Sequence, residues 1–228
     1  LVSSRGLGDV YKRQIMISSA SIFDRMPHNS PHSDALPERQ YRPKHYYGAS
    51  KYDAELFCLS QPNNNWIGLR PRAVFGPGDQ TLIPRLTRLI GKNSYKTIGD
   101  GSGLIDVTCL SNFVDAVCLA IDAPEDKLGK FYNISNGDPR TFNSIMKAYT
   151  DKLPGVYQQR KLPYIPILLL SHLASFTASL IPGRPWEPNL TPYGVRQVTA
   201  SLTLDISGAQ EALNWHPKKS FEEGMEEL

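Results

Sequence analysis

The sequence is poor in residues that cross-link chains or bind metals. It has 3 cysteines and 5 histidines among 228 residues. Cys58, Cys109 and Cys118 share no metal-ligand spacing, so we interpret them as reduced thiols and predict no metal site. This cysteine usage excludes a small secreted scaffold that depends on disulfides.

The sequence also lacks a strong charge of one sign. Its net charge is +3, and residues 1–14, with Arg5, Lys12 and Arg13 against Asp9, supply most of it. Residues 4–14 resemble a translated sequencing adapter, so we expect 1–14 to be a non-native leader. A basic leader peptide is the alternative, but the apolar core of such a peptide is missing. The remaining chain gives no sign of a nucleic-acid partner.

No apolar run has the roughly 20 residues that a membrane span needs. The best candidate, 162–182, is interrupted by His172 and several hydroxyls and is bounded by prolines. We favour a buried helix that covers an apolar substrate site. A helix lying on a membrane through 165–181 is the alternative, so the predicted location is cytoplasmic with or without membrane association.

What is present is an ordinary globular composition, with 40% hydrophobic and 21% charged residues. Apolar runs that suit buried strands alternate with segments of helical spacing, which favours an α/β fold with a parallel sheet built of βαβ units. The expected strands are 15–19, 66–69, 104–108 and 130–135, and the expected helices are 47–59, 82–91, 112–123, 141–152 and 206–214.

Tyr47 and Lys51 place a phenol and an ammonium four residues apart, on one face of a predicted helix. A nearby cation favours phenolate, so such a tyrosine can give or take a proton while a hydride moves at the adjoining carbon. The spacing alone is weak, because Tyr157 and Lys161 repeat it where no other signal supports chemistry.

The context of Tyr47 is more specific. Ser18-Ser19-Ala20-Ser21-Ile22-Phe23 ends the strand upstream, and a proline-rich loop leads to the helix. This order resembles the extended short-chain dehydrogenase/reductases. The resemblance implies that Ser19 holds the substrate, Tyr47 is the acid/base, and Lys51 binds the cofactor ribose. Two alternatives stay open: Ser19 as a capping hydroxyl, and Ser18 as the functional serine.

The turn Leu69-Arg70-Pro71-Arg72-Ala73-Val74-Phe75-Gly76-Pro77-Gly78-Asp79 is also similar to a turn of that family. The resemblance implies cofactor contacts by Tyr47, Lys51, Pro71 and Val74. It further implies substrate contacts by Ser19, Ala20, Asp79 and Arg85. Asp100 and Asp106, which follow in a stretch similar to the family's, are interpreted as structural.

Two later segments narrow the branch. Residues 132–139 and the tail 190–224 are similar to the 3β-hydroxysteroid dehydrogenase group, which includes sterol 4-carboxylate 3-dehydrogenases and 2-alkyl-3-oxoalkanoate reductases. The implied activity is an NAD(P)-dependent oxidation or reduction at a secondary alcohol or 3-oxo group of a sterol-like or long-alkyl substrate. A nucleotide-sugar epimerase or dehydratase and a non-catalytic binding protein are the alternatives.

The resemblance also shows what is missing. The family's N-terminal glycine-rich turn, which binds pyrophosphate, is absent, and so is the residue that chooses NAD or NADP. We therefore expect a truncated, inactive chain that holds the C-terminal part of a Rossmann-like doubly wound parallel sheet and a smaller, mostly helical α/β substrate domain. A homodimer is expected from the family. The predicted bounds are 15–125 for the first domain, with 78–103 contributing to the second, and 126–228 for the second.

Overall fold

A three-stranded parallel sheet forms the centre of the chain. The computed structural model describes residues 13–27, 31–179, 188 and 190–228, so most of the predicted leader lies outside the described residues. Parallel neighbours require long crossover connections, and a helix lies in each crossover here. The strand order is β1-β2-β7, with β1 at Gln14–Ile17, β2 at Trp66–Pro71 and β7 at Phe131–Ile134.

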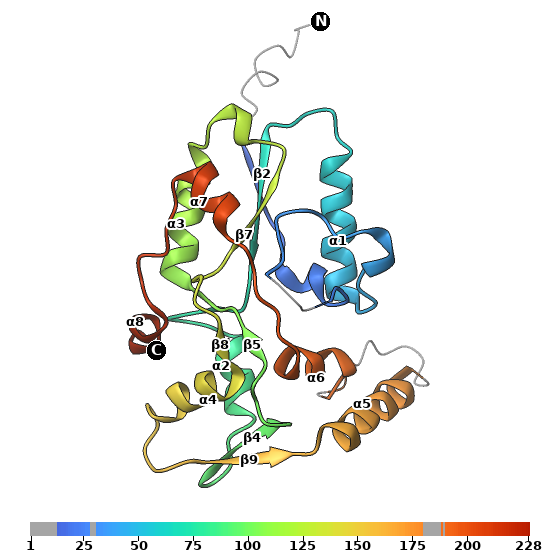
Figure 1. Cartoon of the computed structure of the whole chain (residues 1–228), viewed down its shortest axis with the longest axis vertical. Coiled ribbons are helices and arrows are strands. Elements are labelled where there is room, and N and C mark those ends of the chain that lie inside the picture. The colour runs from blue at the N-terminus through green and yellow to red at the C-terminus, as the bar shows by residue number, and fades with distance from the viewer. Residues whose placement is uncertain (1–12, 28–30, 180–187, 189) are drawn as a thin grey trace, which may run out of the picture.

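Helices cover both faces of this sheet. Helix α1 (Tyr46–Leu59) lies on one side, and α3 (Leu110–Ile121) lies on the other together with α7 (Ser207–Leu213) (Figure 1). Helix α3 turns Ala116 and Ala120 inward, and both are fully buried because small side chains allow a close approach to the strands. This arrangement confirms the predicted α/β class with a parallel sheet.

A second apolar cluster, which includes Phe75, Phe142 and Met146, takes its residues from α2, α4, α6, α8 and the short strands between them. The division into two domains at the predicted bounds stays a prediction. The helices are α2 (Leu82–Thr87), α4 (Phe142–Thr150), α5 (Tyr164–Ser179), α6 (Pro192–Thr199) and α8 (Phe221–Glu226); the strand pairs are β4 (Ser94–Ile98) with β9 (Gln158–Leu162), β3 (Val74–Phe75) with β6 (Thr108–Cys109), and β5 (Leu104–Ile105) with β8 (Arg140–Thr141); short 3-10 turns are η1 (Ala20–Phe23), η2 (Arg39–Tyr41) and η3 (Glu125–Lys127).

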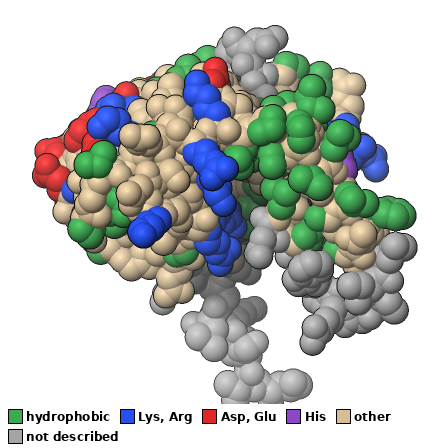
Figure 2. All heavy atoms as spheres, turned by 90° about the horizontal axis from the view of Figure 1, so that it is seen from below, with side chains coloured by type: hydrophobic (Ala, Val, Ile, Leu, Met, Phe, Trp, Pro, Cys, Tyr) green, Lys and Arg blue, Asp and Glu red, His purple; other side chains and the backbone are tan. Residues whose placement is uncertain are grey.

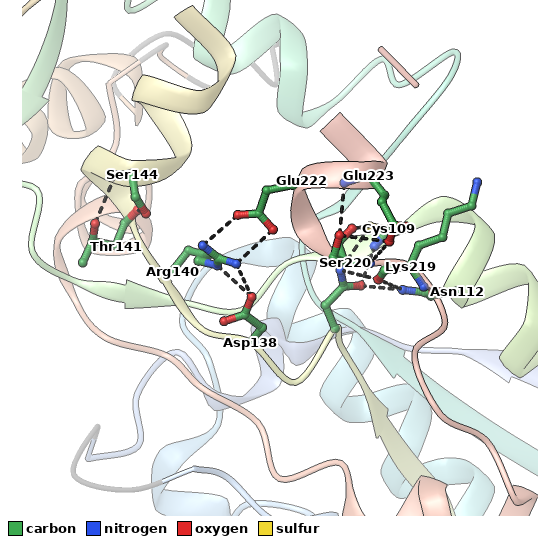
Figure 3. A network of polar contacts seen from close by, with 11 residues as sticks. Cys109, Asn112, Asp138, Arg140, Thr141, Ser144, Lys219, Ser220, Glu222 and Glu223 are labelled. Carbon is green, nitrogen blue, oxygen red and sulfur yellow. Dashed lines mark hydrogen bonds and ion pairs between the residues drawn. The ribbon is translucent and has the colours of Figure 1, made fainter. Parts of the chain in front are cut away.

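A buried amide network joins the two clusters (Figure 3). The Asn112 amide nitrogen donates to Asn136 Oδ1 at 3.0 Å and to the Lys219 carbonyl at 2.8 Å. Its oxygen accepts from the backbone of Lys218 and Lys219. Ser220 then starts α8 with a capping box. Because Asn112 lies on α3, these bonds fix the C-terminal segment against the sheet layer.

The second Tyr-x-x-x-Lys pattern does not form a helical pair. Residues 158–162 are strand β9, where successive side chains alternate between faces. The Tyr157 hydroxyl donates to the Pro154 carbonyl at 3.2 Å, within its own turn. The strand conformation therefore removes this pattern as a candidate site.

The prediction of a buried helix at 165–181 is wrong for the part that the structure describes, which ends at residue 179. Only Ser171 and Ala178 of α5 are buried. The helix stands at the edge of the molecule, beside α6, and its apolar residues Ile165, Leu169, Leu173 and Phe176 are 67, 65, 58 and 62% exposed. Within the described ranges, no helix combines the length and apolarity needed to cross a bilayer.

Candidate active site

The two serines after β1 point to different partners. Ser18 is buried, and its hydroxyl donates to Glu55 Oε1. Ser19 is half-buried and begins η1, where its Oγ accepts from the Ser21 amide at 3.2 Å and lies 2.5 Å from Ser21 Oγ. Because Ser18 is engaged in the interior, the structure favours Ser19 as the accessible hydroxyl. Ser19 is a cap in this structure, and its contact with the substrate stays a prediction.

Tyr47 and Lys51 lie on the first turns of α1. The Lys51 ammonium donates to the Ile17 carbonyl, the last of β1, at 2.8 Å, and lies 5.9 Å from the centre of the Tyr47 ring. Tyr47 is 53% exposed. Lys51 therefore connects α1, which also carries Tyr47, to the carboxyl end of β1, two residues before Ser19. Ligands of open α/β sheets bind at this edge.

The turn after β2 reaches the same edge. Pro71 ends β2, and Ala73 has a φ of +45°, a left-handed conformation that lets the chain reverse into β3 at Val74. The Thr108 hydroxyl fixes this turn, because it donates to the Arg72 carbonyl at 2.6 Å and accepts from the Arg72 amide. The main chain at Pro71 and Val74 is thus held rigidly beside the edge. Its predicted cofactor contact stays a prediction.

The other predicted substrate residues have separate roles in the fold. Ala20 has a fully buried side chain, which leaves only its main chain for a ligand. Asp79 accepts from the amides of Thr81, Leu82 and Ile83, so its carboxylate caps the start of α2. Arg85 lies exposed on α2, and its charge acts on Tyr193. Their substrate contacts remain untested predictions.

A buried ion pair that the sequence patterns did not reveal lies beneath the serines. Glu55 of α1 and Arg70 of β2 are each 1% exposed, and Arg70 Nη2 donates to Glu55 Oε2 at 2.6 Å. Arg70 also contacts the rings of Phe23 and Phe131 at 5.6 and 5.1 Å. Because Ser18 donates to Glu55, this pair fixes the strand end that carries Ser19.

A second missed group comes from helix α6. Asp24, which ends η1, is buried and accepts from Arg196 Nη2 at 2.9 Å. The Tyr193 ring stacks on His45 with 3.6 Å between ring centres, and His45 begins α1. Burial raises the pKa of the Tyr193 phenol, against smaller opposite effects from Arg72 and Ser21. These contacts join α6 to η1, which Ser19 begins, and to α1, which carries Tyr47 and Lys51.

A cavity of about 390 Å³ lies elsewhere, and neither Ser19, Tyr47 nor Lys51 lines it. Asp34 and Arg70 contribute to its wall. Burial raises the pKa of Asp34 to about 6, although a hydrogen bond from the Asn133 amide opposes this. We therefore assign the candidate active site to the sheet edge rather than to this cavity.

Asp106 agrees with its structural interpretation. It is fully buried, and its Oδ2 accepts from the Leu204 amide at 2.6 Å. Asp100 accepts from the Ser102 amide in a surface turn, as a structural aspartate does. Burial raises the pKa of Asp106 to about 6, against a hydrogen bond from Leu204 that lowers it.

This pKa gives a prediction for stability. The folded state holds the Asp106 proton more tightly than the unfolded chain, so its contribution to stability is present below the ordinary pKa of 3.8 and is lost as pH rises through about 6. Asp106→Asn removes this pH-dependent loss of stability, which amounts to about 3 kcal/mol for a pKa shift of this size. We expect the free energy of unfolding of the variant, relative to wild type, to rise between pH 4.5 and 7.5 in urea titrations. Asp122→Asn on the exposed surface is the control, and equal pH profiles for Asp106→Asn and wild type would contradict the prediction.

Comparison with known proteins agrees with this geometry. The chain is 36% identical to the uncharacterized protein YbjS of Escherichia coli, covering 93% of the chain and 64% of that protein. It is 31% identical to 3beta-hydroxysteroid-dehydrogenase/decarboxylase isoform 2 of Arabidopsis thaliana, covering 94% and 40%. It is 28% identical to the 2-alkyl-3-oxoalkanoate reductase of Stenotrophomonas maltophilia, covering 80% and 56%. The chain thus spans less than two thirds of these relatives.

Solved structures show the same fold. MoeE5 in complex with UDP-glucuronic acid and NAD matches with a TM-score of 0.64 and 22% identity, covering 94% of the chain and 62% of that structure. This confirms the predicted Rossmann-like class. The model of the NAD dependent epimerase/dehydratase family matches residues 6–135. Together with the relatives above, this match shows that the chain belongs to that family, as its serine, tyrosine and lysine motifs predicted.

Proposed function

We propose that the natural protein containing this chain is an NAD(P)-dependent oxidoreductase. Its substrate would be an apolar molecule, sterol-like or long-alkyl, with a secondary alcohol or 3-oxo group. One observation carries the proposal. The Lys51 ammonium lies beside the Tyr47 ring and donates to the carbonyl of Ile17 at the end of β1 at 2.8 Å, and Ser19 follows Ile17 by two residues. The names of the Arabidopsis and Stenotrophomonas relatives, which describe such activities, support the substrate class.

The residues at this edge fit a nicotinamide cofactor. An ammonium has three N–H groups, and Lys51 uses one on the Ile17 carbonyl. The others suit the hydroxyls of a ribose. The main chain from Pro71 to Val74 is fixed at the same edge, where a carboxamide can meet backbone groups.

The proposed chemistry divides the work among three side chains. A bound nicotinamide cofactor would supply or accept the hydride. Tyr47 would give a proton to the substrate oxygen during reduction, or take one during oxidation. Ser19 would hold that oxygen by a hydrogen bond, and Lys51 would stabilise the phenolate form of Tyr47 through its positive charge.

A substrate panel tests this proposal. The complete natural protein is incubated with NAD or NADP and with 3-hydroxysteroids, long-chain 3-hydroxy acids and UDP-sugars. Formation of the reduced cofactor is followed by its absorbance, and sugar products are identified by chromatography. We expect reduction of the cofactor with one of the apolar alcohols. Conversion of UDP-sugars alone would support the epimerase or dehydratase alternative instead.

We also propose that α5 touches the surface of an anionic membrane. Its exposed apolar side chains gather on the underside of the molecule, next to a stripe of Lys and Arg (Figure 2). Arg160 and Lys161, which are exposed on β9, immediately precede the helix. Apolar side chains that enter the acyl boundary beside basic ones that meet phosphate groups are typical of interfacial helices.

This membrane contact predicts a loss of vesicle binding. The change Leu169→Ser with Leu173→Ser removes two apolar side chains that would be buried in lipid, so binding to phosphatidylserine-containing vesicles should fall about tenfold or more. Co-sedimentation measures it. The matched control is Val114→Ser with Ile121→Ser, which removes exposed apolar groups from α3. An equal loss for both double variants, or none for the first, would contradict the contact.

The exposed Leu56 and Phe57 on α1 support a further proposal, that two copies of the protein associate. These side chains are 50 and 65% exposed on a helix whose other face meets the sheet. An apolar helix face of this kind is suited to pack against its symmetry mate. The homodimer expected from the family resemblance is thus our proposal for the assembled protein.

A further inference from the structure

We propose that Tyr193 of α6 is a positioning residue: its ring packs on His45 and so holds the start of the helix that carries Tyr47 and Lys51. This inference rests on the proposed oxidoreductase function. Tyr193 does not belong to the predicted trio, yet its ring contacts the residue that begins α1.

The contact is made by the ring. The Tyr193 ring stacks on the imidazole of His45, with 3.6 Å between centres and 24° between planes. His45 Nδ1 accepts from the Gly48 amide at 3.1 Å and so caps α1 two residues before Tyr47. A Cβ at Gly48 would lie 2.5 Å from the imidazole, so only glycine lets His45 fold over the helix start. The ring therefore covers the cap of the helix that carries Tyr47 and Lys51.

An ion pair holds Tyr193 in place. Arg196 lies one turn later on α6 and bonds Asp24, which ends the η1 turn that Ser19 begins. Asp24 Oδ2 is also 3.9 Å from His45 Nε2. Thr191 caps the start of α6 by accepting from the Gly194 amide at 3.0 Å. Tyr193 thus lies on a capped helix that Arg196 fixes to the η1 turn through Asp24.

The ring and the hydroxyl can be tested separately. Tyr193→Phe keeps the stacked ring, whereas Tyr193→Ala removes it. In the complete natural protein we expect Tyr193→Ala to lower kcat about two- to tenfold, the worth of one aromatic contact, with KM for the cofactor unchanged. Tyr193→Phe should keep wild-type turnover, because the ring remains on His45.

The outcomes separate this inference from the function on which it depends. An equal loss of kcat in Tyr193→Phe and Tyr193→Ala, or a change in KM alone, would overturn the positioning role. If the complete protein shows no NAD(P)-dependent activity, the proposed function fails, and amide hydrogen exchange then decides the ring contact. We expect Tyr193→Ala, but not Tyr193→Phe, to speed exchange at Gly48 about tenfold; unchanged exchange in Tyr193→Ala would overturn it.

Discussion

Replacing Tyr47 by phenylalanine should lower turnover by a factor of about 100 or more, the usual worth of a positioned acid or base. The variant loses the hydroxyl that would exchange a proton with the substrate oxygen. It keeps a ring of the same shape beside Lys51, whose bond to the Ile17 carbonyl does not involve Tyr47. The Kd of the cofactor should therefore stay nearly unchanged. Steady-state kinetics and fluorescence titration of the complete natural protein measure the two quantities.

Tyr46→Phe is the matched control for this experiment. Tyr46 is the adjacent residue on α1 and is 95% exposed, so removing its hydroxyl should leave turnover at the wild-type level. A Tyr47→Phe variant that retained more than about a tenth of wild-type turnover would contradict the acid/base role. A loss that came with weaker cofactor binding would instead point to a change in the shape of the site.

The second large effect is expected on stability. Arg70→Met leaves the Glu55 carboxylate buried without its cation, which costs about 3–5 kcal/mol. For a chain of this size the melting temperature should fall by about 6–20 °C. The strand end that carries Ser18 should also loosen, because Ser18 donates to Glu55. Thermal unfolding of the chain followed by circular dichroism measures the change.

An exposed ion pair of the same kind provides the comparison. Arg42 Nε donates to Asp53 at 2.8 Å, but their side chains are 42 and 52% exposed. Water and salt screen such a pair, so Arg42→Met should change the melting temperature far less than Arg70→Met. Adding Glu55→Leu to Arg70→Met should recover part of the loss, since no buried charge then remains unpaired. Equal effects of Arg42→Met and Arg70→Met would contradict this account.

Local spacing predicted the main features of the site. The expected helix 47–59 is α1 (Tyr46–Leu59). It was predictable because apolar residues at helical intervals and the asparagine-rich segment that follows are both local features of the sequence. Once that helix forms, Tyr47 and Lys51 lie on the same face, because they are four residues apart. The strand end at Ser19 was predictable for the same reason, since an apolar run followed by hydroxyls fixes where β1 stops.

Contacts between distant residues were not predictable. Arg196 and Asp24 are separated by 172 positions, and no local pattern marks them as partners. Strands β4 and β9 likewise pair across a long separation and were not among the expected elements. Tyr193 lies in a tail segment that resembled the family's, but its stacking on His45 depends on how α6 packs against α1. Such positions follow from the tertiary fold, not from spacing.

The apolar segment of α5 was misinterpreted for a different reason. Hydrophobicity predicts that a side chain leaves water, but it does not say what will cover it. Leu169 and Phe176 satisfy the pattern of a core helix, yet they remain exposed at the edge of the molecule. A membrane surface would resolve this conflict, because lipid would remove those side chains from water without a protein partner.

The most direct test of the central claim combines the substrate panel with the tyrosine variant. The complete natural protein and its Tyr47→Phe form are assayed with NAD or NADP against 3-hydroxysteroids, long-chain 3-hydroxy acids and UDP-sugars. We predict that the wild type reduces the cofactor with an apolar secondary alcohol and that Tyr47→Phe does not. Turnover of UDP-sugars alone, or equal oxidation of the alcohol by both proteins, would contradict the claim that this chain carries the proton-transfer site of an oxidoreductase for apolar substrates.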